Sequence, residues 1–129
     1  MNRLKLAPIE NGKVTITVED GAQGEIVLKL AGSIDHPAPG SFLDPYFVSL
    51  HGAALEGNVR AVHVDFTQLS FLNSSGIKAL IKWVMTCASL EASSRYAIKL
   101  LYSSKVTWQQ TSLRAITVLT KGFVVTEGV

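Results

Sequence analysis

The stretch that decides the fold reads Val62-His63-Val64-Asp65-Phe66-Thr67-Gln68-Leu69-Ser70-Phe71-Leu72-Asn73-Ser74-Ser75-Gly76-Ile77. Its first part alternates apolar and polar side chains, with Val62, Val64 and Phe66 on one face, as in a strand with one buried side. Its last part sets a capping asparagine and two serines before an apolar pattern of three- and four-residue spacing. The stretch therefore predicts a strand that leads directly into the N-terminus of a helix.

This helix is predicted from Asn73 to about Glu91, with one broad apolar face made of Ile77, Leu80, Ile81, Val84, Met85 and Ala88. Asn73 is placed to cap it, and Ser74 and Ser75 fall in the first turn, where unpaired backbone N–H groups point outward. A negative charge there gains roughly 0.3–1 kcal/mol when exposed. A phosphate on Ser74 would add about −1.5 to −2 charge at a position where the helix dipole favours it.

The segment before residue 62 predicts a hairpin and a first helix. Residues 14–18 and 26–30 alternate in period two and are joined by a glycine-bearing turn, which favours an antiparallel pair. Asp44-Pro45 is typical of a helix N-cap followed by proline at the first helical position, and the helix is expected to end at Gly57-Asn58. Its predicted buried residues are Phe47, Leu50 and Ala54.

The segment after residue 91 predicts another strand, a helix and a last short strand. Period-two alternation over residues 96–102 indicates the strand, and residues 106–119 indicate the helix. The helix residues expected to face inward are Trp108, Ala115, Ile116 and Leu119. A final strand is expected at residues 123–126.

These elements predict one α/β domain over residues 1–129: an initial β-hairpin followed by alternating helices and strands. Alternation with short links predicts a mixed, mostly parallel sheet with right-handed crossovers, and hence all helices on one face. A chain of 129 residues has the length for one hydrophobic core.

Composition argues against several classes of protein. The net charge is only +2, and the 12 basic residues are scattered singly, so no nucleic-acid partner is expected. No run of about 18 apolar residues predicts a membrane span, and the N-terminus lacks the apolar stretch of a secretion signal. A single cysteine, Cys87, permits no internal disulfide, and His63 with Asp65 lacks further ligands for a metal. A cytoplasmic protein without cofactor or metal is expected.

The residues quoted at the outset resemble the signature of the STAS family, the domain shared by sulfate transporters and bacterial anti-sigma factor antagonists. That signature is an apolar strand, a short loop and then Asp-Ser-Ser/Thr-Gly-Leu at the start of a helix. Gly32-Ser33-Ile34-Asp35 resembles the family's Gly-x-Leu/Ile-Asp strand end. The resemblance implies a regulatory protein-binding module that is not an enzyme. Its expected contact residues are Ser33, Ile34, Asp35, Asn73, Ser74, Ser75 and Gly76.

In the antagonists, the serine directly after the aspartate accepts phosphate from a kinase that also acts as anti-sigma factor. The resemblance therefore implies Ser74 as phosphoacceptor, with a serine kinase and a phosphatase as partners. Asn73 stands where the family has aspartate, a change expected to leave the fold unaffected because both residues cap helices. It removes a carboxylate beside the hydroxyl, which leaves a second hypothesis: an unphosphorylated scaffold or a small-ligand or nucleotide sensor. After Gly128-Val129, the final helix typical of the family is not expected.

Overall fold

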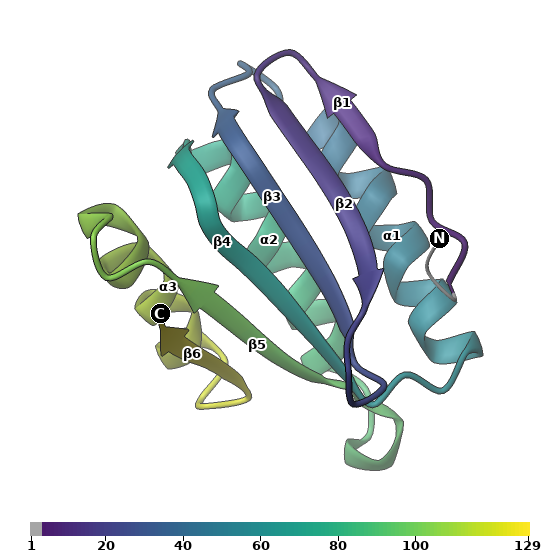
Figure 1. Cartoon of the computed structure of the whole chain (residues 1–129). Helices are drawn as coiled ribbons and strands as arrows, with labels where there is room; N and C mark the ends of the chain where they lie inside the picture. Colours follow the sequence, from purple (N-terminus) through teal and green to yellow (C-terminus); the bar gives the residue numbers. More distant parts are fainter. Residues whose placement is uncertain (1–3) are drawn as a thin grey trace.

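A computed structural model describes residues 4–129 as a twisted sheet of six strands with three α-helices packed behind it (Figure 1). The elements are β1 (Ile9–Asn11), β2 (Val14–Asp20), β3 (Ile26–Ile34), α1 (Gly40–Glu56), β4 (Ala61–Leu72), α2 (Ser74–Ala88), β5 (Ala97–Tyr102), α3 (Thr107–Leu119) and β6 (Val124–Gly128), with a short 3-10 helix at Ala92–Ser94 before β5.

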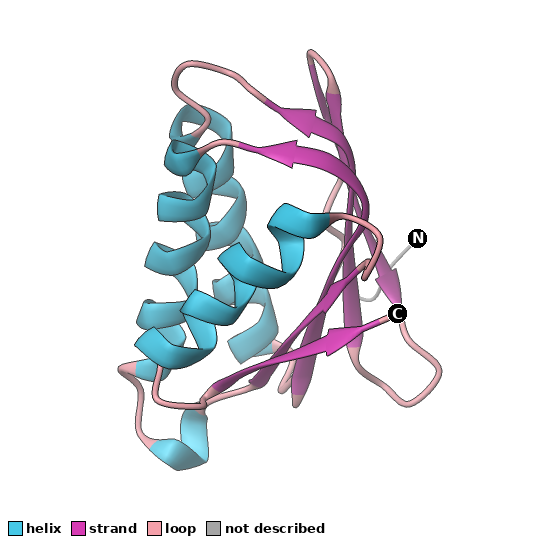
Figure 2. Ribbon diagram, turned by 90° about the vertical axis from the view of Figure 1, so that its left-hand side faces the viewer, coloured by secondary structure: helices cyan, strands magenta, loops and turns pink. Residues whose placement is uncertain are grey.

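The strands lie in the sheet in chain order, from β1 to β6. The pairs β1–β2 and β2–β3 are antiparallel, and β3 through β6 are parallel to their neighbours. Figure 2 shows all helices on one side of the sheet. The predicted fold class is confirmed, with β1 as an additional edge strand that the sequence analysis did not include.

The hydrophobic core lies between the sheet and the helices. Residues 62, 64 and 66 of β4 point into it, while residues 63 and 65 are half-buried on the open face, as the period-two pattern predicts. From the helices, the predicted Phe47, Leu50 and Ala54 are all buried.

Helix α1 begins five residues earlier than predicted, at Gly40, and Pro45 lies inside it. Pro39, at φ −64°, already has helical geometry, and its carbonyl accepts from the N–H of Leu43 at 2.9 Å. Leu43 is fully buried, so its burial favours extending the helix over the missing N–H of Pro45. Asp44 consequently caps nothing and forms an ion pair with Lys82 of α2 at 3.5 Å.

The buried faces of the other two helices differ in part from the prediction. In α2, Met85 is exposed, and the face against the sheet is centred on Ala79, Trp83 and Cys87 as well as Leu80 and Val84. In α3, Ala115 and Leu119 are exposed, so their predicted burial was wrong. Helix α3 buries Gln109, Leu113 and Ile116.

The second half of β4 is bulged, and side chains of α3 form hydrogen bonds with its backbone carbonyl groups. The β3–β4 register shifts twice after Lys29, and the pairing of β4 with β5 ends at Asp65. Beyond that point Gln109 donates from Nε2 to the carbonyl oxygens of Phe66 and Leu69, each at 2.7 Å. The indole N–H of Trp108 donates to the carbonyl of Ser70 at 2.8 Å. Two side chains of α3 thus stand in for a neighbouring strand and hold the end of β4 in place.

Candidate functional site

The candidate site lies where β3 and β4 end side by side, at the top of the view in Figure 1. Ser33 pairs with Phe71 and Ile34 with Leu72, so the two predicted segments are adjacent in space. The N–H of Asn73 then donates to the carbonyl of Ile34 at 3.0 Å, which extends the strand pairing to the first residue of the loop. The structure therefore brings together Ser33, Ile34 and Asp35 with the loop Asn73-Ser74-Ser75-Gly76.

The side chain of Asn73 uses both of its polar atoms. Oδ1 accepts from the N–H of Gly76 at 2.8 Å, which is the predicted N-cap of α2. Nδ2 donates to the carbonyl of His36 at 2.8 Å and so ties the segment after β3 to the start of the helix. An aspartate carboxylate would keep the cap but has no proton for the His36 carbonyl. Asn73 therefore caps α2 as expected within the predicted fold, and its amide makes one further bond that an aspartate could not make.

Gly76 is a requirement of close packing. A Cβ at this position would lie within 2.4 Å of Leu72 Cδ1 and 3.3 Å of Ile34 Cγ2. Its buried position lets the first turn of α2 lie directly against the ends of β3 and β4. Gly76 therefore lies buried beneath the site, while Ser74 and Ser75 face solvent.

Ser74 and Ser75 are both exposed in the first turn of α2. Within residues 4–129, their backbone N–H groups donate to no protein acceptor, because Asn73 caps only the third amide of the helix. The first turn contains no acidic residue. Lys78 follows Ser74 by four residues and is also exposed, a spacing at which side chains on a helix are neighbours. An anionic group on Ser74 would meet two free N–H groups, the helix dipole and a cation.

Of the predicted residues at the end of β3 and just after it, Asp35 faces solvent and Ile34 does not. Asp35 forms an ion pair at 3.1 Å with Lys13, which lies in the turn between β1 and β2. Ile34 is only 1% exposed, so its side chain belongs to the core and its carbonyl alone serves the loop. Ser33 is half-buried.

Two residues of the site were missed by the sequence analysis. Phe71 is 47% exposed beside Ser33, although it lies in a strand, because the bulge at Ser70 changes which side chains face inward. His36 supplies the carbonyl that Asn73 binds, and its ring packs edge-on against Phe42 with centroids 5.7 Å apart. An exposed aromatic residue next to a polar loop is a common feature of protein contact surfaces. The alternation of Val62, Val64 and Phe66 does not reveal the bulges between these residues and Phe71, so it could not place the Phe71 side chain beside the loop.

Comparisons with solved structures found proteins that share the fold of this chain. An anti-sigma factor antagonist from Mycobacterium paratuberculosis superposes with a TM-score of 0.57 at 22% identity, covering 82% of this chain and 81% of that one. The anti-sigma factor antagonist SpoIIAA in its unphosphorylated form gives 0.55 at 20% identity, covering 87% of each chain. A protein from Shewanella loihica with a SpoIIAA-like fold gives 0.56 at 15% identity, covering 92% and 90%.

The chain has the SpoIIAA-like fold. The resemblance to anti-sigma factor antagonists inferred from the residue pattern is thereby confirmed at the level of the fold. No family model matches the sequence, and no curated protein matches it.

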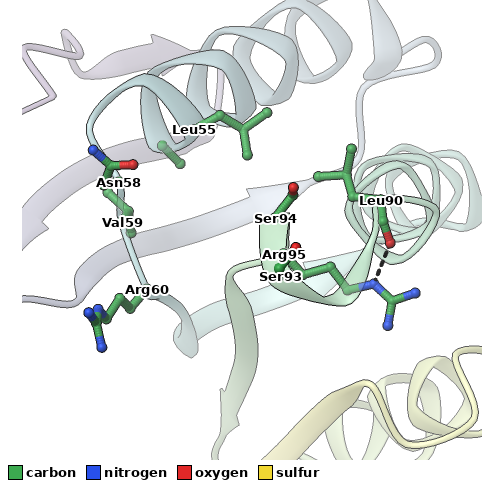
Figure 3. Close-up of a pocket in the computed structure, with 9 residues that line it drawn as sticks. Leu55, Asn58, Val59, Arg60, Leu90, Ser93, Ser94 and Arg95 are labelled. Atoms are coloured by element: carbon green, nitrogen blue, oxygen red, sulfur yellow. Dashed lines mark hydrogen bonds between the residues drawn. The ribbon is translucent and has the colours of Figure 1, made fainter.

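A hollow on this SpoIIAA-like chain lies away from the loop. It measures about 820 Å³ and lies at the opposite end of β4, between the end of α1 and the 3-10 helix (Figure 3). Arg60 and Arg95 stand on its two sides and extend away from one another, and Arg95 donates to the carbonyl of Leu90. Their divergence leaves no point at which both guanidinium groups converge on one ligand.

Two further findings concern the described residues 4–129 alone. None of their helices is long and apolar enough to cross a membrane. Their His, Cys, Asp and Glu side chains form no group of three or more that could hold a metal ion.

Proposed function

We propose that this chain is a regulatory binding module that docks onto a protein of the anti-sigma factor type, and that it acts without catalysis. The docking surface is formed by Ser33, Asp35 and the loop Asn73-Ser74-Ser75-Gly76. The partner is a serine kinase, and Ser74 is its phosphoacceptor. A phosphatase restores the unmodified form.

The exposure of Ser74 at the capped N-terminus of α2 is the observation that carries this proposal. Its hydroxyl is accessible, and two N–H groups beside it have no protein acceptor within residues 4–129. Phosphorylation there adds about −1.5 to −2 charge at the positive end of the helix, so the modified loop stays folded. The same charge alters the surface that contacts the partner, and this surface also includes Asp35 and Phe71.

A pull-down from the native host tests the switch. Tagged wild-type protein and Ser74→Ala are expected to capture the same kinase-type partner, and Ser74→Asp is expected to lose it. Ser94→Asp is the matched control, because Ser94 is an exposed serine in the 3-10 helix at the other end of the molecule. Equal capture by Ser74→Asp and Ser74→Ala contradicts the proposal.

A second candidate function follows from the role of Asn73. Its amide is committed to Gly76 and His36, and because residue 73 is an asparagine, the loop lacks the carboxylate of the STAS signature beside Ser74. The chain would then be an unphosphorylated scaffold or small-ligand sensor. Intact mass of the protein purified from its host separates the two: an added phosphate at Ser74 supports the switch, and its absence under every growth condition supports the scaffold.

A further inference from the structure

A cleft of about 190 Å³ opens between α1 and α2, which run side by side across the same face of the sheet (Figure 1). Helix α1 supplies Phe47 and Val48, and α2 supplies Ala79 and Trp83. Phe47 and Trp83 are buried and stack in parallel, with ring centroids 4.9 Å apart. Val48 is exposed on the wall of the cleft. The lining is apolar apart from one histidine, a rim threonine and a charged pair, the usual make-up of a small-molecule site.

The histidine is His51, and the tautomer of its ring is assigned from its hydrogen-bond partners. The indole N–H of Trp83 can only donate, and it donates to the hydroxyl of Tyr96 at 2.8 Å. We assign the hydroxyl proton of Tyr96 to Nδ1 of His51, 2.6 Å away, because this places a donor against an acceptor in both contacts of the hydroxyl. Burial also lowers the pKa of His51, which favours the neutral ring. Nδ1 is thus the acceptor, and Nε2 carries the ring's one N–H donor.

The charges at the rim cancel one another. Lys82 Nζ and Asp44 Oδ2 lie 3.5 Å apart, one from each helix, and both side chains are accessible to solvent. The hydroxyl of Thr86 already donates to the carbonyl of Lys82 in its own helix. A ligand of either charge would be repelled by one member of this ion pair, so the site favours an uncharged molecule.

We propose that this cleft binds an uncharged, ring-sized molecule that accepts one hydrogen bond from Nε2–H of His51. An apolar cavity of about 150 Å³ is sufficient to hold benzene, so a volume of about 190 Å³ admits a ring with one small polar substituent. Phe47, Val48 and Trp83 supply the apolar lining that would contact the ring. A ketone, ester or amide on an aromatic or alicyclic ring has this chemistry. The site is independent of Ser74 and goes beyond the proposed docking function.

Acetophenone, an uncharged aromatic ketone, is the probe, and proton–nitrogen correlation spectra of the full chain are the readout. The two tryptophans provide an internal control, because Trp83 lines the cleft and Trp108 is bonded to Ser70 elsewhere. Titration is expected to shift the indole N–H of Trp83 saturably and leave that of Trp108 in place. An unmoved Trp83 signal, or equal shifts of both indoles, overturns the proposal.

Two variants sharpen the test. Thr86→Trp places a large side chain in the cleft from an exposed rim position and is expected to abolish binding, whereas Thr111→Trp, at an exposed position on α3, is expected to leave it unchanged. His51→Phe removes the donor and is expected to weaken acetophenone about three- to tenfold without weakening toluene, which has no acceptor. Thermal unfolding confirms that each variant is folded. Binding that survives Thr86→Trp refutes the location, and an equal loss of both ligands in His51→Phe refutes the hydrogen bond.

Discussion

Replacing Asn73 with aspartate, the residue that the STAS signature carries at this position, is expected to destabilise the protein. The substitution keeps the cap on Gly76 but turns a hydrogen bond to the His36 carbonyl, 2.8 Å long, into a contact between two oxygen atoms. Leaving a part-buried carbonyl without its donor costs about 2 kcal/mol. A negative charge at the N-terminus of α2 returns about 0.3–1 kcal/mol. The net loss is therefore about 1 kcal/mol in the free energy of unfolding at pH 7.

Urea denaturation followed by circular dichroism measures this loss. With a slope of about 2 kcal/mol per molar urea, the midpoint of Asn73→Asp is expected to fall by about 0.5 M, with the slope unchanged. Asn73→Ala loses the cap as well, worth about 1 kcal/mol more, and gains no charge at the helix end, so its midpoint is expected to fall further. A midpoint for Asn73→Asp at or above that of the wild type would refute the role assigned to the His36 contact.

Three other perturbations have defined outcomes. Gly76→Ala places a Cβ against Leu72 and is expected to lower the free energy of unfolding by about 1–3 kcal/mol. At Gly52 a Cβ would meet no atom within 4 Å, so Gly52→Ala is expected to stabilise α1 by about 0.5–1 kcal/mol. Urea midpoints that move in the same direction for both variants contradict this difference. Gln109→Leu leaves the three backbone partners of this fully buried side chain unpaired and is expected to lower the free energy of unfolding by about 3 kcal/mol or more. A loss below about 1 kcal/mol would show that water replaces these hydrogen bonds. Because burial lowers the pKa of His51 from 6.5, the unfolded chain binds this proton more readily than the folded one, so stability is expected to fall as the pH drops through that value. Thermal unfolding measured from pH 7.5 to 5 tests this pH dependence, and His51→Gln is expected to reduce the loss of stability at low pH.

Most of the fold could be predicted from local sequence patterns. Period-two alternation located the hairpin and β4, and a capping asparagine followed by three- and four-residue spacing located the start of α2, because both signals depend only on neighbours in the chain. The α1 boundary failed for the opposite reason. Asp44-Pro45 is a strong local start signal, yet the burial of Leu43, a tertiary effect, extends the helix over it.

The loop itself was located by the sequence, and its chemistry was decided by the tertiary structure. Asn73 as a cap follows from its place before the helix, since the amide it serves is three residues away. Its second bond, to His36, joins residues 37 positions apart, and no spacing rule reaches that far. The same holds for Gln109, a polar residue that becomes fully buried because the bulged end of β4 presents it with unpaired carbonyls. The sequence alone determined where the strand turns into the helix; only the packing of distant segments decided which polar atoms that turn needs.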